Sequence, residues 1–419
     1  MTQTVSIACA GDVLVTRELT ASARAGLLGD LSRIWDGCTA RFANLETLFH
    51  DYECPAMSES GGTWVRSDPV IARELRELGI DLVSNANNHS GDYAWPALVR
   101  TCEVLNEAGI VHAGAGPDLA TAREAAFLET PGARIAVLAA TATFPTHAMA
   151  GAARSGIPAR PGISYLRYRV EHELPSGALR ALRSIAGRFE PQESADRVTL
   201  GPLTFRDGPG YQRTSYCEPE DLGALAAAVQ EARQVADLVL VGLHSHEPGA
   251  DWDEPAPFLI DAAHEIADAG ADLVVANGPH MVAGVERRGG GVIFYGLGSL
   301  FFQNSTPRRY PADACVKAGL AADAGPSAIN MSKWDFSQDE RYWETMVPVC
   351  TWDEGKLTRV ELHPLALHQG PPAAIQGMPY APDAARSRKI LERVALLSRP
   401  FGTSITLAPG AAAACVELS

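Results

Sequence analysis

The sequence predicts a layered α/β fold, and two patterns in roughly the first 300 residues support this prediction. Short runs rich in leucine or β-branched residues end in glycine or polar residues, as the buried strands of a parallel sheet do. Amphipathic stretches lie between these runs, so helices are expected outside the sheet. The expected strands are residues 5–10, 80–84, 134–139, 238–243 and 273–276, with a later one at 356–362. The expected helices are residues 68–78, 95–108, 219–236, 256–269 and 384–397.

Residues at the ends of these elements support the same fold. Asp68 precedes a proline, which predicts an N-cap followed by proline at the first helical position. Gly79 and Gly270 each fit the position just after a helix C-terminus. The strand that follows each glycine ends close to a histidine, His89 in one case and His280 in the other. Open α/β sheets bind ligands at the carboxyl ends of their strands, so both histidines are expected near a ligand site.

Composition restricts the class of protein. The 419 residues are 46% hydrophobic and 20% charged, which is enough for a large core and argues against disorder. An excess of 50 acidic over 35 basic residues gives a net charge of −15, which argues against nucleic-acid binding. The sequence has no long apolar run and no basic N-terminal region, so we expect a cytoplasmic protein with no membrane partner. Its eight cysteines form no CxxC pair, so a thiolate metal site is not expected.

The expected domain organisation is a single domain over residues 1–408 with two inserted regions and a flexible tail at 409–419. The first insertion, about residues 150–217, is proline-rich, has no clear strand ladder and contains one expected helix near 177–189. The second, about residues 304–344, combines aromatic and charged side chains. Loops of this length are commonly lids or binding surfaces, so both insertions are expected to cover the site.

Polar side chains that bind metal ions gather at the expected strand ends. Carboxylate, amide and imidazole groups together suit Mn, Fe, Zn or Ca better than a thiolate site would. A single Asp at such a position is commonly a helix cap, and a single His is commonly a hydrogen-bonded core residue. The combination, however, favours a metal site. Its members are Asp12, Asn44, Glu46, Asn87, Asn88, His89, Asp92, His244, His246, Glu247, His280 and Glu286.

The order of these clusters resembles a known family. The motifs are GDV, NLE, NANNHSGDY, HAGAG, LHSHE, GPHMVAGVE and FYGLGSLFF. They are similar to those of the CapA/PgsA family, a branch of the calcineurin-like metallophosphatase superfamily, and the likeness runs from Ala10 to about Phe302. The resemblance implies a calcineurin-like metallophosphatase α/β/β/α sandwich with inserted lid regions and a metal site on loops at the strand ends.

The resemblance also implies a role for each matching residue. Glu46 takes the place of the carboxylate that bridges two metals in the superfamily, and Asn88 that of the amide ligand. His89 stands beside Asn88 as an acid, and Asp92 and Glu247 are expected to orient ligands or move protons. The implied metal ligands are Asp12, Glu46, Asn88, His244 and His280.

Two departures from the family pattern affect the number of metal ions. Leu14 stands where the superfamily has the histidine of Asp-x-His, and Gly278 stands where relatives have the first histidine of His-Pro-His. His246 occupies a position where relatives carry glycine and could replace the missing ligand. We therefore expect one divalent ion (Mn, Ca, Co, Zn or Fe) in preference to two.

The residues and the resemblance together favour a peptide epimerase of the soluble lasso-peptide subset of CapA-like proteins. Inversion at an α-carbon needs a base on one face and an acid on the other, and the pairs His89–Asp92 and His246–Glu247 are expected in these roles. A bound metal would stabilise the enolate. The alternatives are a soluble metal-dependent hydrolase of a phosphoester or amide, a poly-γ-glutamate or capsule assembly protein, and a binding module without turnover.

The expected partner is a peptide substrate. Arginine is suited to binding carboxylates through its planar fork. Arg160 and Arg167, together with Trp343 of the second insertion, are therefore expected to contact the substrate, although exposed arginines are also ordinary solvated surface.

Overall fold

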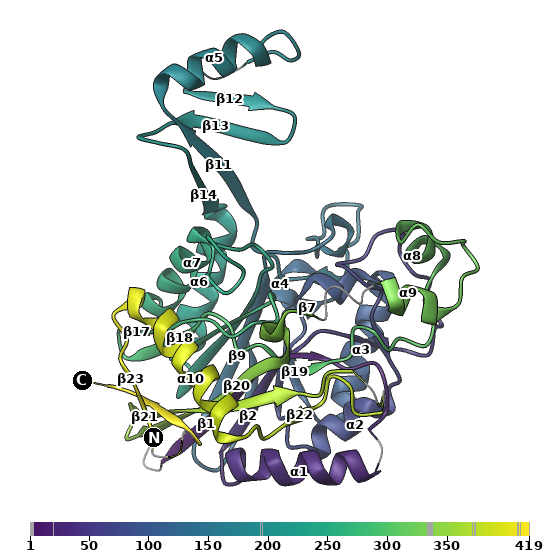
Figure 1. Cartoon of the computed structure of the whole chain (residues 1–419), viewed down its shortest axis with the longest axis vertical. Helices are drawn as coiled ribbons and strands as arrows, with labels where there is room; N and C mark the ends of the chain where they lie inside the picture. The colour runs from purple at the N-terminus through teal and green to yellow at the C-terminus, as the bar shows by residue number, and fades with distance from the viewer. Residues whose placement is uncertain are drawn as a thin grey trace.

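The computed structural model in Figure 1 describes residues 4–19, 21–192, 194, 196–332, 338–370, 372, 374–408, 410 and 412–418. Two sheets pack face to face. The first has the order β23-β24-β21-β20-β1-β2-β5-β6, with β19 beside β1 and β22 beside β21. Its strands are β1 (Val5–Leu14), β2 (Ala40–Leu45), β5 (Leu82–Ser84), β6 (Val111–Ala113), β19 (Ser299–Phe302), β20 (Glu344–Asp353), β21 (Lys356–Leu367), β22 (Pro379–Tyr380), β23 (Ile405–Leu407) and β24 (Ala414–Val416).

The second sheet has the order β17-β18-β16-β15-β9-β8. Its strands are β8 (Ala126–Glu129), β9 (Arg134–Thr141), β15 (Leu238–His244), β16 (Leu273–Asn277), β17 (Val285–Arg288) and β18 (Gly291–Phe294). Within each sheet the central strands β1, β2 and β5, or β9, β15 and β16, run parallel, so their carboxyl ends lie at one edge. Short pairs join β3 (Leu48–Phe49) to β4 (Arg66–Ser67) and β7 (Ala115–Gly116) to β10 (Gly162–Ile163).

Helices cover the outer faces of both sheets. The described helices of the body are α1 (Ala21–Trp35), α2 (Val70–Glu77), α3 (Ala94–Ala108), α4 (Leu119–Arg123), α6 (Pro219–Arg233), α7 (Pro257–Asp268), α8 (Ala312–Lys317), α9 (Pro326–Ser332) and α10 (Ala384–Ser398). Side chains of α2 pack on the first sheet, and those of α6 and α7 pack on the second. A third apolar cluster lies between the sheets, where Phe42 meets Leu240 and Val275. The result is the expected α/β/β/α sandwich.

The expected strands and helices are present, and the glycine C-caps are confirmed. Gly79 and Gly270 follow α2 and α7 at φ +97° and +118°, a left-handed region that glycine adopts without a steric penalty. The expected cap at Asp68 is wrong. Pro69 takes the N-cap position of α2, and the Asp68 carboxylate instead forms ion pairs with Arg66 and Arg308.

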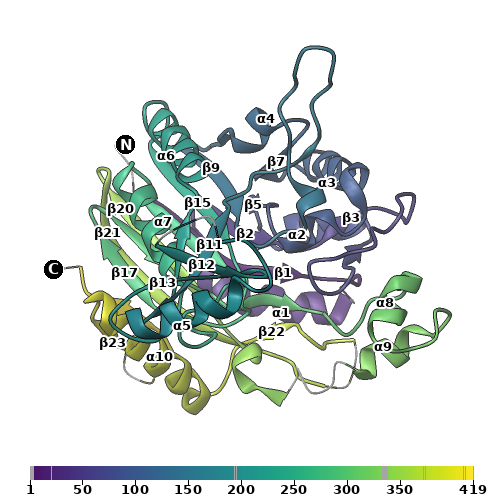
Figure 2. The same ribbon diagram turned by 90° about the horizontal axis from the view of Figure 1, so that it is seen from above.

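The first insertion differs most from expectation, because it contains the strand ladder that the sequence did not reveal. A sheet with the order β12-β13-β11-β14 is formed by β11 (Tyr168–Leu174), β12 (Arg197–Leu200), β13 (Leu203–Asp207) and β14 (Gln212–Cys217). The expected helix is present as α5 (Ser176–Ala186) and packs on this sheet through Leu179 and Ala186. Figures 1 and 2 show residues 168–217, which we call the arm, projecting from the body above α6 and α7.

The end of the chain also corrects an expectation. Residues 409–419 were expected to be a flexible tail, but β24 lies in this segment and pairs with both β21 and β23. Ala414 and Val416 are buried, so burial of apolar side chains holds this part of the segment against the sheet. None of the described helices is long and apolar enough to span a bilayer.

Candidate metal centre

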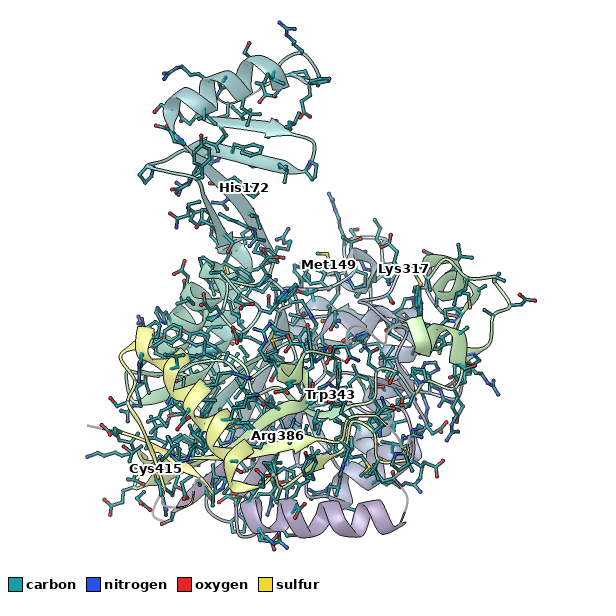
Figure 3. The ribbon with its side chains drawn as sticks, viewed as in Figure 1. Met149, His172, Lys317, Trp343, Arg386 and Cys415 are labelled. Carbon is teal, nitrogen blue, oxygen red and sulfur yellow. The ribbon has the colours of Figure 1, made fainter. Side chains whose placement is uncertain are left out.

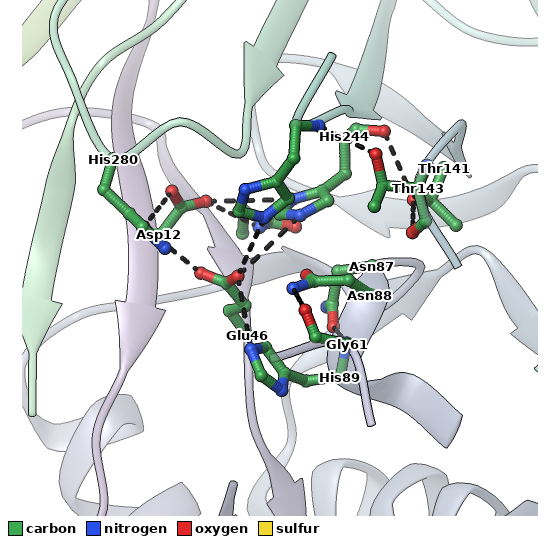
Figure 4. Close-up of polar contacts among 12 residues, drawn as sticks. Asp12, Glu46, Gly61, Asn87, Asn88, His89, Thr141, Thr143, His244 and His280 are labelled. Carbon is green, nitrogen blue, oxygen red and sulfur yellow. Dashed lines mark hydrogen bonds and ion pairs between the residues drawn. The ribbon is translucent and has the colours of Figure 1, made fainter. Parts of the chain in front are cut away.

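The polar clusters singled out in the sequence converge at the carboxyl ends of the central strands (Figure 4). Asp12 lies near the end of β1, and Glu46 directly follows β2. His244 is the last residue of β15, and His280 lies just beyond β16. Because both sheets present these ends at one side, the four side chains meet between the sheets.

Glu46 is the centre of the cluster. Its carboxylate is fully buried, and neither oxygen has a hydrogen-bond partner. Four imidazole nitrogens surround it, His280 Nδ1 at 3.6 Å, His244 Nε2 and His246 Nε2 at 3.7 Å, and His89 Nε2 at 3.9 Å. Burial is the main cause that raises the pKa of Glu46 to about 8. A buried carboxylate without partners is costly, and a cation would satisfy it.

Two groups of side chains could hold such a cation, and they share Glu46. One is Asp12, Glu46 and His280, and the other is Glu46, His244 and His246, each with ligand atoms within 4.8 Å of one another. Burial lowers the pKa of His244 well below its ordinary value and that of His246 to about 4, so both rings are neutral and able to bind a metal near pH 7. The residues therefore fit a divalent ion. Preference for one ion over two stays a prediction.

Asn88 is held with its amide oxygen available for the same centre. Asn87 caps the short 3₁₀ turn η1 (Asn88–Gly91), because its side chain accepts a hydrogen bond from the backbone N–H of His89 at 3.0 Å. The Asn88 amide nitrogen donates to the Gly61 carbonyl at 3.0 Å, and its Oδ1 has no hydrogen-bond partner. This arrangement brings Asn88 into the cluster, as the sequence predicted.

His89 and Asp92 form the expected pair. His89 Nδ1 donates to Asp92 Oδ2 at 2.7 Å, which places the ring proton on Nδ1 and turns Nε2 toward Glu46. Asp92 is fully buried and also accepts hydrogen bonds from the backbone N–H groups of Gly61 and Val65, at 3.1 and 2.8 Å. The carboxylate is therefore fixed, and it orients His89 as a proton donor or acceptor beside the metal ligands.

The second expected pair is not formed, which corrects the prediction for Glu247. His246 turns toward Glu46, but Glu247 turns toward the arm, where it forms an ion pair with Arg213. The Tyr168 hydroxyl donates to its other oxygen at 2.9 Å. Because both carboxylate oxygens are engaged by the arm, Glu247 does not orient His246 for proton transfer.

The structure explains the departure at Gly278. Its φ is +135°, and a Cβ at this position would lie 2.2 Å from the Ser245 carbonyl oxygen, so no side chain fits there. His246 supplies an imidazole to the centre from the neighbouring loop. His280 itself adopts a φ of +60°, an uncommon conformation for a histidine and one that is frequent at functional sites.

Asn44 orients two metal-site side chains, a role that the sequence did not reveal. Its amide nitrogen donates to Asp12 Oδ1 at 2.8 Å and lies 3.1 Å from His244 Nδ1. It thus orients one side chain from each sheet. The available signal was its position two residues before Glu46 at the end of a strand, since alternate residues share a face.

A cavity of about 420 Å³ opens beside the metal ligands. Its walls are partly apolar and aromatic, and the described lining residues include no arginine or lysine. A cavity of this size accommodates a small-molecule ligand or a few residues of a peptide-like chain. The lining residues are Leu14, Gly61, Gly62, Thr63, Asn88, His89, His246, Trp252, Pro279, His280, Asn304 and Tyr342.

The three residues expected to bind substrate lie outside this cavity. Arg160 is exposed and donates to the Met149 carbonyl, and Arg167 forms a two-point ion pair with Asp221 at 2.7 and 3.1 Å. Trp343 is buried in the body (Figure 3), and the second insertion contributes Asn304 and Tyr342 to the cavity instead. None of the described residues of the first insertion lines the cavity, so in the part of the chain that the structure describes this insertion does not cover the site as expected.

Two helix-covered sheets with a carboxylate shared between two ligand groups at their strand ends define a metallophosphatase-like protein. The model of the bacterial capsule synthesis protein PGA_cap matches residues 6–304, and the chain belongs to this family.

The chain is similar to one uncharacterized protein and to two proteins whose names refer to capsule or polymer synthesis. The uncharacterized protein y4sH of Sinorhizobium fredii is 30% identical over 417 residues, which cover 95% of this chain and 90% of that protein. The capsule biosynthesis protein CapA of Bacillus anthracis is 22% identical over 274 residues, 63% of this chain and 52% of CapA. A probable polyglutamine synthesis accessory protein of Mycobacterium tuberculosis is 26% identical over 237 residues, 56% of this chain and 48% of that protein. These names favour the assembly alternative over the epimerase.

Proposed function

We propose that the protein is a metal-dependent hydrolase that cleaves amide bonds of a glutamate-type polymer in a capsule-type synthesis system. The names of its relatives suggest capsule and polyglutamine synthesis. The choice of a glutamate polymer rests on the resemblance to the CapA/PgsA family, whose name refers to poly-γ-glutamate assembly. The observation that carries the chemistry is Glu46, a fully buried carboxylate without hydrogen-bond partners that four histidines surround. Such a cluster is poorly satisfied by protein alone and well satisfied by a divalent ion.

Asp12, Glu46, His244, His246 and His280, with Asn88, would hold the ion. When bound there, a divalent ion polarises a carbonyl group and lowers the pKa of a water molecule. His89 faces the same centre through Nε2 and has its other nitrogen fixed by Asp92. It is therefore placed to accept a proton at Nε2 from the attacking water and to pass that proton to the leaving amine. Leu14, Trp252 and Tyr342 line the cavity beside this centre.

Hydrolysis fits the number of acid–base pairs better than epimerisation does. Cleavage of an amide needs one proton carrier beside the metal ligands, and His89 with Asp92 is such a pair. Inversion at an α-carbon needs a second carrier on the opposite face, and Glu247 is engaged by Arg213 and Tyr168. The epimerase remains a second candidate because His246 and His89 both line the cavity.

A pair of isotope-labelling incubations distinguishes hydrolysis from epimerisation. The protein, loaded with Mn²⁺ or Co²⁺, is incubated with a γ-linked glutamate oligomer, once in H₂¹⁸O and once in D₂O, and the products are analysed by mass spectrometry. Hydrolysis predicts shorter oligomers with one ¹⁸O in the new carboxylate and no deuterium on carbon. Intact oligomers that carry α-deuterium would establish epimerisation instead. A metal-loaded protein that does neither to γ-linked or α-linked oligomers would contradict the proposal.

A further inference from the structure

The arm contains a second cavity that is separate from the metal centre. Its volume is about 540 Å³, and no residue lines both cavities. Its lining residues are Arg169, Glu171, Pro191, Gln192, Ser194, Arg197, Thr199 and Thr204. These residues belong to β11, β12 and β13 and to the loop between α5 and β12. Figure 1 shows these elements projecting away from the body that carries the metal ligands.

We infer that this cavity binds the carboxylate groups of an acidic chain. The central observation is Glu171, whose side chain is only 2% exposed at the floor of the cavity. Arg197 Nε lies 2.9 Å from Glu171 Oε1, and Arg169 Nε lies 3.4 Å from the same oxygen. Each guanidinium therefore contacts Glu171 through its Nε.

The anchored arginines have donors to spare. Arg197 is half-exposed, and its terminal nitrogens have no partner among the described residues. Arg169 uses one terminal nitrogen in a loose ion pair with Glu218 at 3.6 Å. Arg206 brings a third guanidinium to Glu171, at 3.4 Å from Oε2. Arg206 is already paired with Glu173. The charged side chains that line the cavity are Arg169, Arg197 and Glu171, so the described lining carries one net positive charge that a ligand carboxylate can neutralise.

The charge distribution of the chain supports an anionic ligand. Residues 151–217 contain ten arginines and six acidic residues, whereas the whole chain carries a net charge of −15. This segment therefore has a net positive charge within an acidic chain, which favours association with a polyanion. The side chains of Gln192, Ser194, Thr199 and Thr204 add neutral hydrogen-bonding groups around the two arginines. This set of groups suits a chain of spaced carboxylates.

The choice of ligand rests on the proposed function, because a glutamate polymer carries one carboxylate per residue. Binding at the arm would hold such a chain near the body without using the metal ligands. A free phosphate ion shares the oxyanion chemistry, so the experiment includes it as a separate probe.

The test is a titration of fluorescein-labelled pentaglutamate with the full-length, metal-free protein, followed by fluorescence anisotropy. We expect saturable binding that weakens as salt is added. Arg169→Gln and Arg197→Gln should each weaken it roughly tenfold, because each removes a charge-assisted contact. Arg188→Gln is the matched control, since this exposed arginine of the same insertion lies outside the cavity lining. The affinity of the Arg188→Gln protein for pentaglutamate should differ from that of the wild type by less than about twofold.

Hydrogen exchange of the wild-type protein tests the location without any substitution that could unfold the arm. Pentaglutamate should protect backbone amides in residues 196–206 and leave those of residues 61–63 unchanged. Absence of binding, equal effects of Arg188→Gln and Arg197→Gln, or protection at the metal cavity instead would each overturn the inference. Phosphate binding that depends on Arg169 and Arg197 without pentaglutamate binding would also overturn it. Because the protein is metal-free and binding is the readout, failure of hydrolysis leaves this test unaffected.

Discussion

The two cavities of this protein obtain their charge in opposite ways. Around the metal cavity, Glu46 is buried without a hydrogen-bond partner, and the lining residues that the structure describes include no arginine or lysine, so the cluster suits a bound cation. In the arm, Arg169 and Arg197 carry permanent positive charge and are anchored by the buried Glu171. A metal-requiring cavity is suited to chemistry, and a guanidinium-lined cavity is suited to recognition. In the two proposals above, the chain therefore places bond cleavage and polymer binding in separate cavities.

The two regions nevertheless touch. Glu247 directly follows His246, and its carboxylate contacts Arg213 and Tyr168 of the arm. The Tyr168 ring also stacks on Phe258 of α7 at a centroid distance of 4.2 Å, which fixes the base of the arm on the body. The predictions below ask how independent the two cavities are.

Substitution of metal ligands should have the largest effect. Asp12→Ala or Glu46→Ala should lower metal content at least tenfold and turnover about a hundredfold or more, because each removes a carboxylate ligand. Elemental analysis and an oligomer-cleavage assay measure the two effects, and His112→Ala is the control because it lies outside both ligand groups. Pentaglutamate binding by the arm should not change. A parallel loss of that binding would show that the cavities are not separate.

Substitution of the proton carrier should affect turnover but not metal content. We expect His89→Ala to slow cleavage about a hundredfold, the ordinary contribution of a positioned acid or base. Asp92→Asn should have a smaller effect in the same direction, because the ring loses its fixed tautomer. Steady-state rates and metal analysis check this together. A His89→Ala protein that loses its metal would instead make His89 a ligand.

Metal binding should release a proton in a pH-dependent way. Burial raises the pKa of Glu46 to about 8, whereas a carboxyl group of this type ordinarily titrates near 4.5. Because the metal binds the carboxylate, binding near pH 7 should release about one proton from Glu46, and the release should disappear above about pH 9. The lowered pKa values of His244 and His246 keep these rings from adding protons at pH 7.

Calorimetric titration in two buffers of different ionisation enthalpy measures this release.

The raised pKa of Glu46 also affects the stability of the metal-free protein. The folded pKa lies above the unfolded one, so the stabilisation by neutral Glu46 is complete below about pH 4.5 and is lost as the pH rises through 8. The metal-free Glu46→Gln protein, which cannot titrate there, should lack this component. Proton release that stays constant from about pH 6 to 9 would contradict the assignment.

The contact between arm and body should give the smallest effect. Arg213→Gln removes the ion pair with Glu247, and since Arg213 is 41% exposed, we expect metal affinity to fall only a few-fold. Direct metal titration measures this change, with Arg188→Gln as the control. No change at all would mean that His246 is positioned without help from the arm, by the hydrogen bond from its backbone N–H to Thr143 Oγ1 at 2.8 Å.

The sandwich and most of the metal centre could be predicted from the sequence because both depend on local patterns. Buried parallel strands are recognised in the sequence as apolar runs. The polar residues that follow these runs meet at one edge of the sheet, independently of loop conformation. Asp12, Glu46 and His280 were found in this way. Glu247 was misassigned because its partners Arg213 and Tyr168 come from an insertion whose position no local pattern reveals.

The arm shows the other limit of sequence reasoning. Its strands alternate charged with apolar residues, as in Arg169 and Glu171 of β11, and prolines lie in the short connections between them, so the pattern predicted irregular loop. The ladder forms because the face with Val198 and Phe205 is covered by α5. That pairing is long-range, and it also creates the arginine cavity. Trp343 failed as a substrate contact for a similar reason, since the apolar cluster around Leu14 and Phe302 buries it.

The most direct test of the central claim, that chemistry and recognition occupy different cavities, is the steady-state cleavage of a long glutamate oligomer by three metal-loaded proteins. The proteins are the wild type, the Arg169→Gln/Arg197→Gln double variant and His89→Ala. The account predicts that the arm variant raises KM about tenfold or more with kcat unchanged, and that His89→Ala lowers kcat about a hundredfold with KM nearly unchanged. An arm variant that lowers kcat at unchanged KM, or that cleaves the oligomer like the wild type, would contradict the separation of the two cavities.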